Sequence, residues 1–149
     1  MLLKILHFHL DSLVLAALID MNIDLFLSET EQNVKNILCL DFDGVIHNDH
    51  LGFHDGTIYG EPIPGSIESI QNLSKRYKVI IYTCKANPKR PLINGKNGVQ
   101  LIWEWLEKYN IKDCIYDVTF TKPQALAYID DKAIRFENWS DTNIFLEKL

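Results

Sequence analysis

The sequence predicts an α/β protein with a three-layer α/β/α arrangement, in which helices pack on both faces of a parallel sheet, preceded by an N-terminal helical extension. Three observations lead to this fold class. From Asn36 onward, short apolar runs alternate with amphipathic segments. The clearest run, Lys78–Tyr82 (KVIIY), is apolar and β-branched, as strands buried on both faces of a sheet are. Several runs end on an acidic or hydroxyl side chain, which indicates the carboxyl edge of a parallel sheet.

The overall composition is that of an ordinary globular chain. Its 149 residues suit one domain, with 47% hydrophobic and 23% charged residues. The net charge of -5 supplies no general basic field for nucleic acid, although a local patch would suffice. Cys39, Cys84 and Cys114 are odd in number and widely spaced, so they indicate neither a disulfide framework nor a zinc knuckle. We therefore expect a cytoplasmic protein.

The N-terminal segment is apolar enough to raise the question of a membrane. Its longest stretch without charge, Ser12 to Ile19, is far too short for a span, and no small-residue cleavage site follows it. Met1 to Leu27 instead indicates one or two amphipathic helices with apolar residues on more than one face. We expect residues 1–35 to be an extension that packs on a catalytic domain of residues 36–149 or joins subunits of a homo-oligomer.

The strands and helices of the second part follow from local patterns. Five strands are expected, at Asn36–Leu40, Lys78–Tyr82, Ile115–Phe120, Ala125–Ile129 and Ile134–Phe136. Three helices are expected, at Gly65–Arg76 after a Pro-Gly turn, at Gly98–Tyr109, and from a capping Ser140 to the C-terminus.

The helix at Gly98–Tyr109 has the strongest start signal. Asn97 takes the N-cap position and Gln100 the capping-box position. Its expected inner face consists of Val99, Ile102, Trp103 and Leu106. Trp105 lies off that face, which leaves it either as part of a contact surface or packed on the N-terminal extension.

Chemically active side chains follow the predicted strands. The first strand leads into Asp41 and Asp43, with Gly44 beside them, and the second ends at Thr83. Lys122 precedes the strand that ends in Asp130 and Asp131. Because the carboxyl ends of parallel strands meet at one edge of the sheet, these groups are expected to converge.

Such a set suits phosphoryl transfer. A carboxylate can attack phosphorus and form an aspartyl-phosphate. Clustered carboxylates repel one another unless a cation is present, and oxygen ligands suit Mg²⁺. A hydroxyl and a lysine can hold phosphoryl oxygens. Each of these residues, taken alone, is more often a turn residue, a helix cap or a surface lysine. The prediction of phosphoryl transfer therefore depends on their joint occurrence at successive strand ends.

The sequences DFDGV, YTCK, TKP and YIDDKAI, in this order, resemble the four motifs of the haloacid dehalogenase (HAD) superfamily across about Asn36 to Trp139. The resemblance implies a Rossmann-like, HAD-like fold and assigns a role to each motif residue. Asp41 would be the nucleophile and a metal ligand, and Asp43 the general acid/base with its backbone carbonyl on Mg²⁺. Thr83 and Lys122 would bind the phosphate. Asp130 would be a further metal ligand, and Asp131 would assist directly or through water.

These assignments predict a magnesium-dependent hydrolase of phosphomonoesters. Dehalogenases of the superfamily lack the second aspartate of the first motif, whereas Asp43 is present here and phosphatases keep it. Many relatives have an arginine at the position of Lys85, so a substrate role does not carry over to this lysine. The expected substrate is a phosphorylated small molecule or nucleotide.

The lengths of the connecting segments predict a small, capless (C0-like) member. Val45 to Pro64 is long enough only for a β-hairpin flap, and Cys84 to Thr121 holds one helix and a loop. Capless relatives tend to accept large substrates or to borrow a lid from a partner subunit. The N-terminal helices could also serve as a lid.

Two other features have alternative explanations. His47, His50 and His54 lie close together in the flap, but no fourth ligand completes a zinc site. We expect His47 to lie over the phosphate mouth because it follows the DFDGVI turn. The loop Lys85–Arg90 carries three positive charges and is either a solvated loop or a rim that attracts anions.

Three rival functions remain. A phosphorylated signalling receiver, a binding switch and not an enzyme, uses similar residues. In receivers the acid pair comes first along the chain and the phosphorylated Asp in the middle, whereas here the DxD comes first and the DD last. A phosphotransferase or phosphomutase of the same superfamily generally needs a cap to exclude water. A nucleic-acid end-processing phosphatase is compatible with an open site, and salt-dependent oligonucleotide binding would reveal it.

Overall fold

The computed structural model describes Ile19, Met21 and residues 36–148. The chain divides into two units, Met1–Asn36 and Ile37–Leu149, and the sheet belongs to the second. The predicted N-terminal helical extension, residues 1–35, lies outside the described residues apart from Ile19 and Met21. Within the described part of the chain, no helix is long and apolar enough to cross a membrane.

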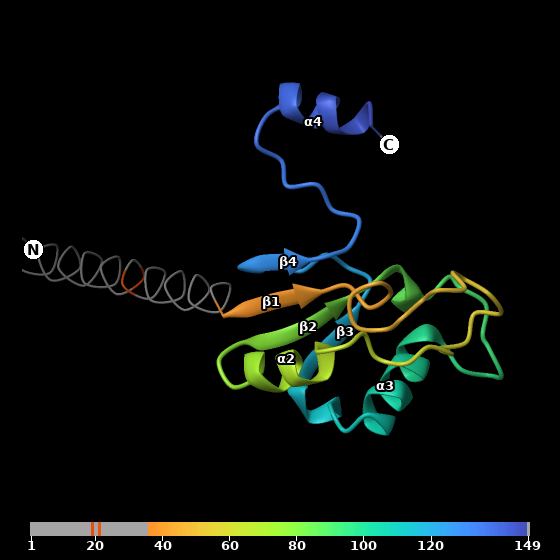
Figure 1. Ribbon diagram of the computed structural model, residues 1–149. Helices are drawn as coiled ribbons and strands as arrows, with labels where there is room; N and C mark the ends of the chain where they lie inside the picture. The colour runs from red at the N-terminus through yellow and green to blue at the C-terminus, as the bar shows by residue number, and fades with distance from the viewer. Residues whose placement is uncertain (1–18, 20, 22–35, 149) are drawn as a thin grey trace, which may run out of the picture. The chain divides into compact units, whose positions relative to one another are not determined.

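The second unit contains a four-stranded, entirely parallel sheet with the strand order β3-β2-β1-β4 (Figure 1). The strands are β1 (Ile37–Leu40), β2 (Lys78–Tyr82), β3 (Ile115–Thr119) and β4 (Ala127–Ile129). The predicted α/β class and the parallel sheet are therefore confirmed. The predicted fifth strand at Ile134–Phe136 is wrong, because this segment has no strand partner and all three residues are exposed.

Helices α2 (Ser66–Leu73), α3 (Gly98–Lys108) and α4 (Trp139–Leu146) occur close to the predicted positions. The capping box of α3 is confirmed: Asn97 accepts a hydrogen bond from the Gln100 backbone, and the Gln100 side chain accepts one from the Asn97 backbone. The predicted cap of α4 is wrong. Asn138 caps this helix by accepting from the Asp141 backbone at 3.0 Å, and Ser140 lies inside the first turn.

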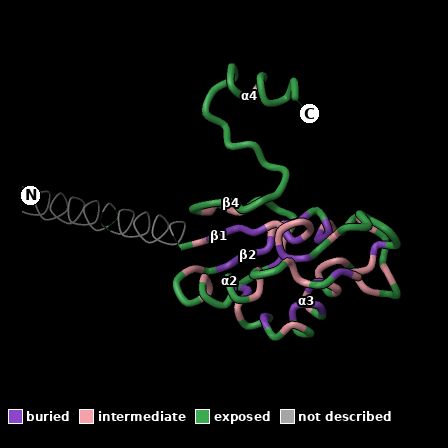
Figure 2. The backbone as a smooth tube through the Cα atoms, viewed as in Figure 1, coloured by how far each residue is buried: buried purple, intermediate pink, exposed green. Residues whose placement is uncertain are grey.

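The buried core lies between the sheet and helices α2 and α3. Alternate strand residues such as Leu40, Ile81 and Val118 point into the same cluster as Ile70 of α2 and Ile102 of α3. Figure 2 shows this contrast, with buried residues along β1 and β2 and on one side of α3, and mostly exposed residues along β4 and α4. Since α2 and α3 contribute to one cluster, the described residues show two layers, and α4 buries no side chain.

Trp105 belongs to this core, so the expectation that it lies on a contact surface is wrong, and the alternative, packing on the N-terminal extension, concerns residues outside the described part of the chain. Only 4% of Trp105 is exposed, and its ring meets the edge of Phe42 at a centroid distance of 5.2 Å. Its indole N–H donates to the carbonyl of Gly60 at 2.9 Å. Helix α3 is therefore fixed to the segment that follows β1.

The segment from Val45 to Pro64 folds back on itself without forming two regular strands. A single antiparallel bridge joins His47 to Pro62. Two backbone hydrogen bonds flank it, from Asn48 to Glu61 at 2.9 Å and from Ile63 to Ile46 at 2.8 Å. The predicted β-hairpin is thus reduced to one point of pairing, and turns occupy its far end.

Candidate active site

The carboxyl ends of three adjacent strands bring the predicted residues together. β1 lies between β2 and β4, so Asp41 after β1 has Thr83 after β2 on one side and Asp130 after β4 on the other. The sheet ladder continues into these positions. The Asp41 N–H donates to the Ile129 carbonyl at 2.9 Å, and the Thr83 N–H donates to the Thr119 carbonyl at 3.0 Å. The backbone of the site is therefore held by the sheet itself.

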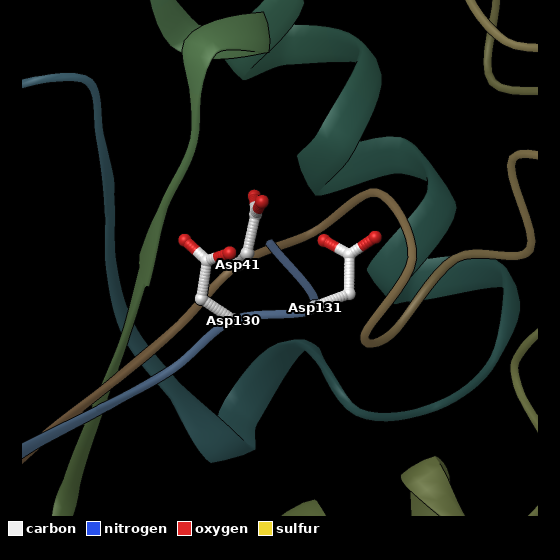
Figure 3. A group of neighbouring side chains, drawn as sticks. All are labelled: Asp41, Asp130 and Asp131. Atoms are coloured by element: carbon white, nitrogen blue, oxygen red, sulfur yellow. The ribbon is translucent and has the colours of Figure 1, made fainter. Parts of the chain in front are cut away.

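Asp41, Asp130 and Asp131 form an acidic triad (Figure 3). One carboxylate oxygen from each lies within 4.8 Å of the other two. In the view of Figure 3 the three carboxylates stand side by side on the same side of the backbone. A donor set made only of carboxylate oxygens suits a hard divalent cation such as Mg²⁺ better than it suits zinc.

The environment of Asp41 favours a partner of positive charge. Burial raises the pKa of this half-buried carboxyl, and the negative charges of Asp130 and Asp43 raise it further. The Phe42 N–H, which donates to Oδ1 at 2.6 Å, and the Thr83 hydroxyl act in the opposite direction. The net effect is a raised pKa, so ionised Asp41 is destabilised until a cation or another positive group balances it.

A tight turn gives Asp131 its place in the triad. Gly44 has a φ of +81°, a conformation that disfavours residues with a side chain. A Cβ atom on Gly44 would lie 2.5 Å from Asp131 Oδ2. On the other strand end, Asp130 Oδ1 accepts the backbone N–H groups of Lys132 and Ala133 at 2.7 and 3.1 Å. The two turns therefore bring the Asp131 carboxylate against the backbone beside Asp43.

Asp43 lies outside the acidic triad and has its own partners. His47 Nδ1 contacts its Oδ1 at 2.8 Å, and Lys85 Nζ contacts its Oδ2 at 3.3 Å. Burial raises the pKa of Asp43, but the hydrogen bond from His47 and the charge of Lys85 outweigh burial and leave the pKa lowered. Asp43 is accordingly a carboxylate at rest, with both oxygens engaged.

The two predicted phosphate-binding groups differ in exposure. Thr83 is buried, and its hydroxyl accepts the Lys85 backbone N–H at 3.3 Å. Lys122 is exposed, and its Nζ lies 4.6 Å from the centre of the Tyr128 ring. Lys122 shares an open pocket of about 580 Å³ with Asp41 and Asp130. Thr83 thus borders the triad from inside the fold, whereas Lys122 reaches the site from the solvent side.

The flap histidines are not gathered at metal-binding spacing. Among the described residues, the acidic triad is the one cluster of His, Cys, Asp or Glu with metal-binding spacing. His50 and His54 pack edge-on against the ring of Tyr59 at 5.5 and 5.6 Å. The expectation that His47 lies over the phosphate mouth is wrong, because its side chain is fully buried in the fold behind Asp43.

Two of the three cations in the loop Lys85–Arg90, which was expected to be either a solvated loop or an anion-attracting rim, are engaged within the fold. Lys85 is only 5% exposed and directs its charge to Asp43. The Arg90 guanidinium stacks over the ring of Phe53 at 5.1 Å. Lys85 and His47 were not predicted from the sequence as partners of Asp43. The spacing of four residues between Asp43 and His47, and the position of Lys85 two residues after Thr83, are the signals that pointed to them.

A comparison of the chain with protein-family models, curated proteins and solved structures finds no match. A function for this chain is therefore inferred from its motif residues and their geometry.

Proposed function

We propose that this chain is a cytoplasmic, magnesium-dependent phosphohydrolase with a Rossmann-like α/β fold of the HAD type. It would act on a phosphomonoester through an aspartyl-phosphate intermediate on Asp41. The observation that carries the proposal is the acidic triad at the carboxyl edge of a parallel sheet, with Asp41 at its centre and Asp43 two residues away. The order of the motifs along the chain supports the same interpretation.

The donor set fits Mg²⁺. Asp41, Asp130 and Asp131 supply carboxylate oxygens within 4.8 Å of one another, and burial together with the charges of Asp130 and Asp43 raises the pKa of Asp41. Bound Mg²⁺ would neutralise these carboxylates and offset the charge of an incoming phosphate. The resemblance adds the backbone carbonyl of Asp43 as a further ligand.

The first step transfers the phosphoryl group to the protein. A carboxylate oxygen of Asp41 attacks phosphorus, a bond forms between this oxygen and phosphorus, and the bond from phosphorus to the leaving oxygen breaks. Asp43 gives a proton to the leaving oxygen. Because Asp43 is a carboxylate at rest, it must first take up this proton from the solvent when the substrate binds, and a nearby phosphate dianion favours the uptake by raising the pKa of Asp43.

The second step releases phosphate. Asp43, again a carboxylate, removes a proton from water, which attacks phosphorus and breaks the bond to Asp41. Thr83 would donate its hydroxyl to a phosphoryl oxygen, and Lys122 would place its ammonium group on another. The pocket beside Asp41 is open and bordered by Tyr128 and Arg135, which supports a phosphorylated small molecule or nucleotide as substrate.

Phosphate release from p-nitrophenyl phosphate tests the proposal. We expect turnover that requires Mg²⁺ and stops in EDTA. Asp41→Asn should lower it by at least about 10³-fold while the circular dichroism spectrum is retained, because an amide cannot act as the nucleophile. A variant that keeps a tenth of the wild-type rate would refute the role of Asp41. Full activity in EDTA would refute the metal requirement, and restoration by Zn²⁺ alone would favour the histidines.

A further inference from the structure

His47 is a fully buried polar side chain beside the proposed acid/base. Its ring stacks parallel to that of Phe42, with a centroid distance of 5.3 Å and an interplanar angle of 7°. The rings of Tyr59 and Trp105 meet it edge-on at 5.3 and 6.0 Å. Three aromatic neighbours therefore fix the plane of the imidazole and leave it no room to rotate.

The hydrogen bonds of His47 determine which ring nitrogen carries the proton. The Gly60 backbone N–H points at Nε2 at 2.8 Å. A backbone N–H can only donate, so Nε2 must accept and carries no proton. The proton of the neutral ring is then on Nδ1, which donates to Asp43 Oδ1 at 2.8 Å.

This arrangement is tied to the rest of the fold through Gly60. The carbonyl of Gly60 accepts the Trp105 indole N–H of α3 at 2.9 Å, while its N–H holds His47. A Cβ atom on Gly60 would lie 1.9 Å from the Asn48 carbonyl oxygen and 2.7 Å from His47 Nε2. One residue without a side chain therefore connects α3 to the imidazole, and the imidazole connects to Asp43.

We propose that His47, as its neutral Nδ1–H tautomer, is a positioning residue that orients the Asp43 carboxylate for proton exchange with the leaving oxygen and with water. Lys85 holds the second oxygen of Asp43 at 3.3 Å, so two buried groups fix the plane of the carboxylate from two sides. The inference rests on the proposed function, because His47 orients Asp43 only if Asp43 is the acid/base. His47 itself does not touch the substrate.

Two substitutions separate this role from a packing role. In asparagine, the amide nitrogen lies as many bonds from Cα as histidine Nδ1 does, so His47→Asn keeps a donor for Asp43 and loses the acceptor for Gly60. In glutamine, the amide oxygen lies as far out as Nε2, so His47→Gln keeps the acceptor for Gly60 and loses the donor for Asp43. His50→Asn, at an exposed position of the same segment, is the matched control.

The assay is kcat/KM with Mg²⁺ for a series of substituted phenyl phosphates, because kcat/KM reports the step in which the leaving oxygen departs. We expect His47→Gln to lose on the order of 10²-fold or more with the poorest leaving groups and much less with p-nitrophenol. His47→Asn should stay within about tenfold of wild type on every substrate. Equal losses in the two variants, or losses that are independent of the leaving group, would overturn the inference.

A second measurement does not depend on activity. Nitrogen-15 NMR of the ring of His47 in the wild-type chain distinguishes the two neutral tautomers and the imidazolium. We expect the Nδ1–H tautomer at pH 8. The Nε2–H tautomer would overturn the inference even if the enzyme is active. The Nδ1–H tautomer in a chain without phosphatase activity would support the geometry and place the failure in the proposed function.

Discussion

Gly44→Ala tests the geometry of the acidic triad without removing any functional group. Gly44 has a φ of +81°, and the new Cβ atom would lie 2.5 Å from Asp131 Oδ2 and 2.7 Å from Asp131 Cγ. The backbone conformation alone costs a residue with a side chain about 1–2 kcal/mol. The carboxylate of Asp131 must also retreat by about 0.9 Å to reach the 3.4 Å of ordinary contact.

The backbone strain and the displaced carboxylate should change different measured quantities. The backbone strain should lower the melting temperature by roughly 2–4 °C for each kcal/mol in a chain of this size. The displaced carboxylate should weaken Mg²⁺ binding and lower phosphate release by about 10²-fold, since a shift of about 1 Å can cost that much. Gly95→Ala is the matched control, because Gly95 has a φ of +78° and nothing lies within 4 Å of its Cβ position.

Melting temperatures from circular dichroism and Mg²⁺-dependent rates on p-nitrophenyl phosphate give both quantities for both variants. Gly95→Ala should melt lower but keep the wild-type rate per folded molecule. If Gly44→Ala also keeps the wild-type rate and the wild-type Mg²⁺ dependence, Asp131 does not belong to a working metal site, and the reasoning from the triad is refuted.

Two further predictions concern stability. The folded-state pKa of Asp41 is raised above its unfolded value, mainly by burial. The charged carboxylate therefore lowers the free energy of unfolding at pH values above the folded pKa. This loss vanishes as the pH falls below the unfolded pKa. Thermal melts in EDTA should therefore show Asp41→Asn more stable than wild type at pH 7, with a difference that shrinks toward pH 4, and a constant difference would contradict this origin. Mg²⁺ should raise the wild-type melting temperature, corresponding to about 2.7 kcal/mol at a hundred times its dissociation constant. The same titration of Asp130→Asn should give a smaller rise, and equal rises would show that Mg²⁺ binds elsewhere.

Local patterns predicted those elements whose stability depends on their own residues. Lys78–Tyr82 was expected as a strand from its β-branched composition, and β2 has these bounds. Asn97 and Gln100 predicted the start of α3, because a capping box satisfies backbone N–H groups within four consecutive residues. The same local reasoning failed at Ile134–Phe136, where an apolar run found no neighbouring strand with which to pair.

The side-chain environments around the site needed contacts between distant parts of the chain. Trp105 is buried because the segment after β1 folds back so that Gly60 accepts its indole N–H, over a separation of 45 residues. His47 is buried for the same reason, since Phe42, Tyr59 and Trp105 enclose its ring. Helical or strand periodicity carries no information about such a fold-back. Trp105 was therefore expected on a contact surface or against the N-terminal extension, and His47 over the phosphate mouth.

The sequence by itself determined the parallel α/β class and the candidate residues at the strand ends, because strand propensity and the order of the acids are properties of short segments. The tertiary structure alone decided how these residues are grouped. It separates Asp41, Asp130 and Asp131, whose oxygens lie within 4.8 Å, from Asp43, which pairs with His47 and Lys85. Asp41 and Asp43 differ by only two positions in sequence, and burial raises the pKa of both, yet the acidic neighbours of Asp41 leave its pKa raised, whereas His47 and Lys85 leave that of Asp43 lowered. The difference between the two pKa values arises from residues that the sheet and the turn at Gly44 bring together, because short-range electrostatic interactions depend on distances in space.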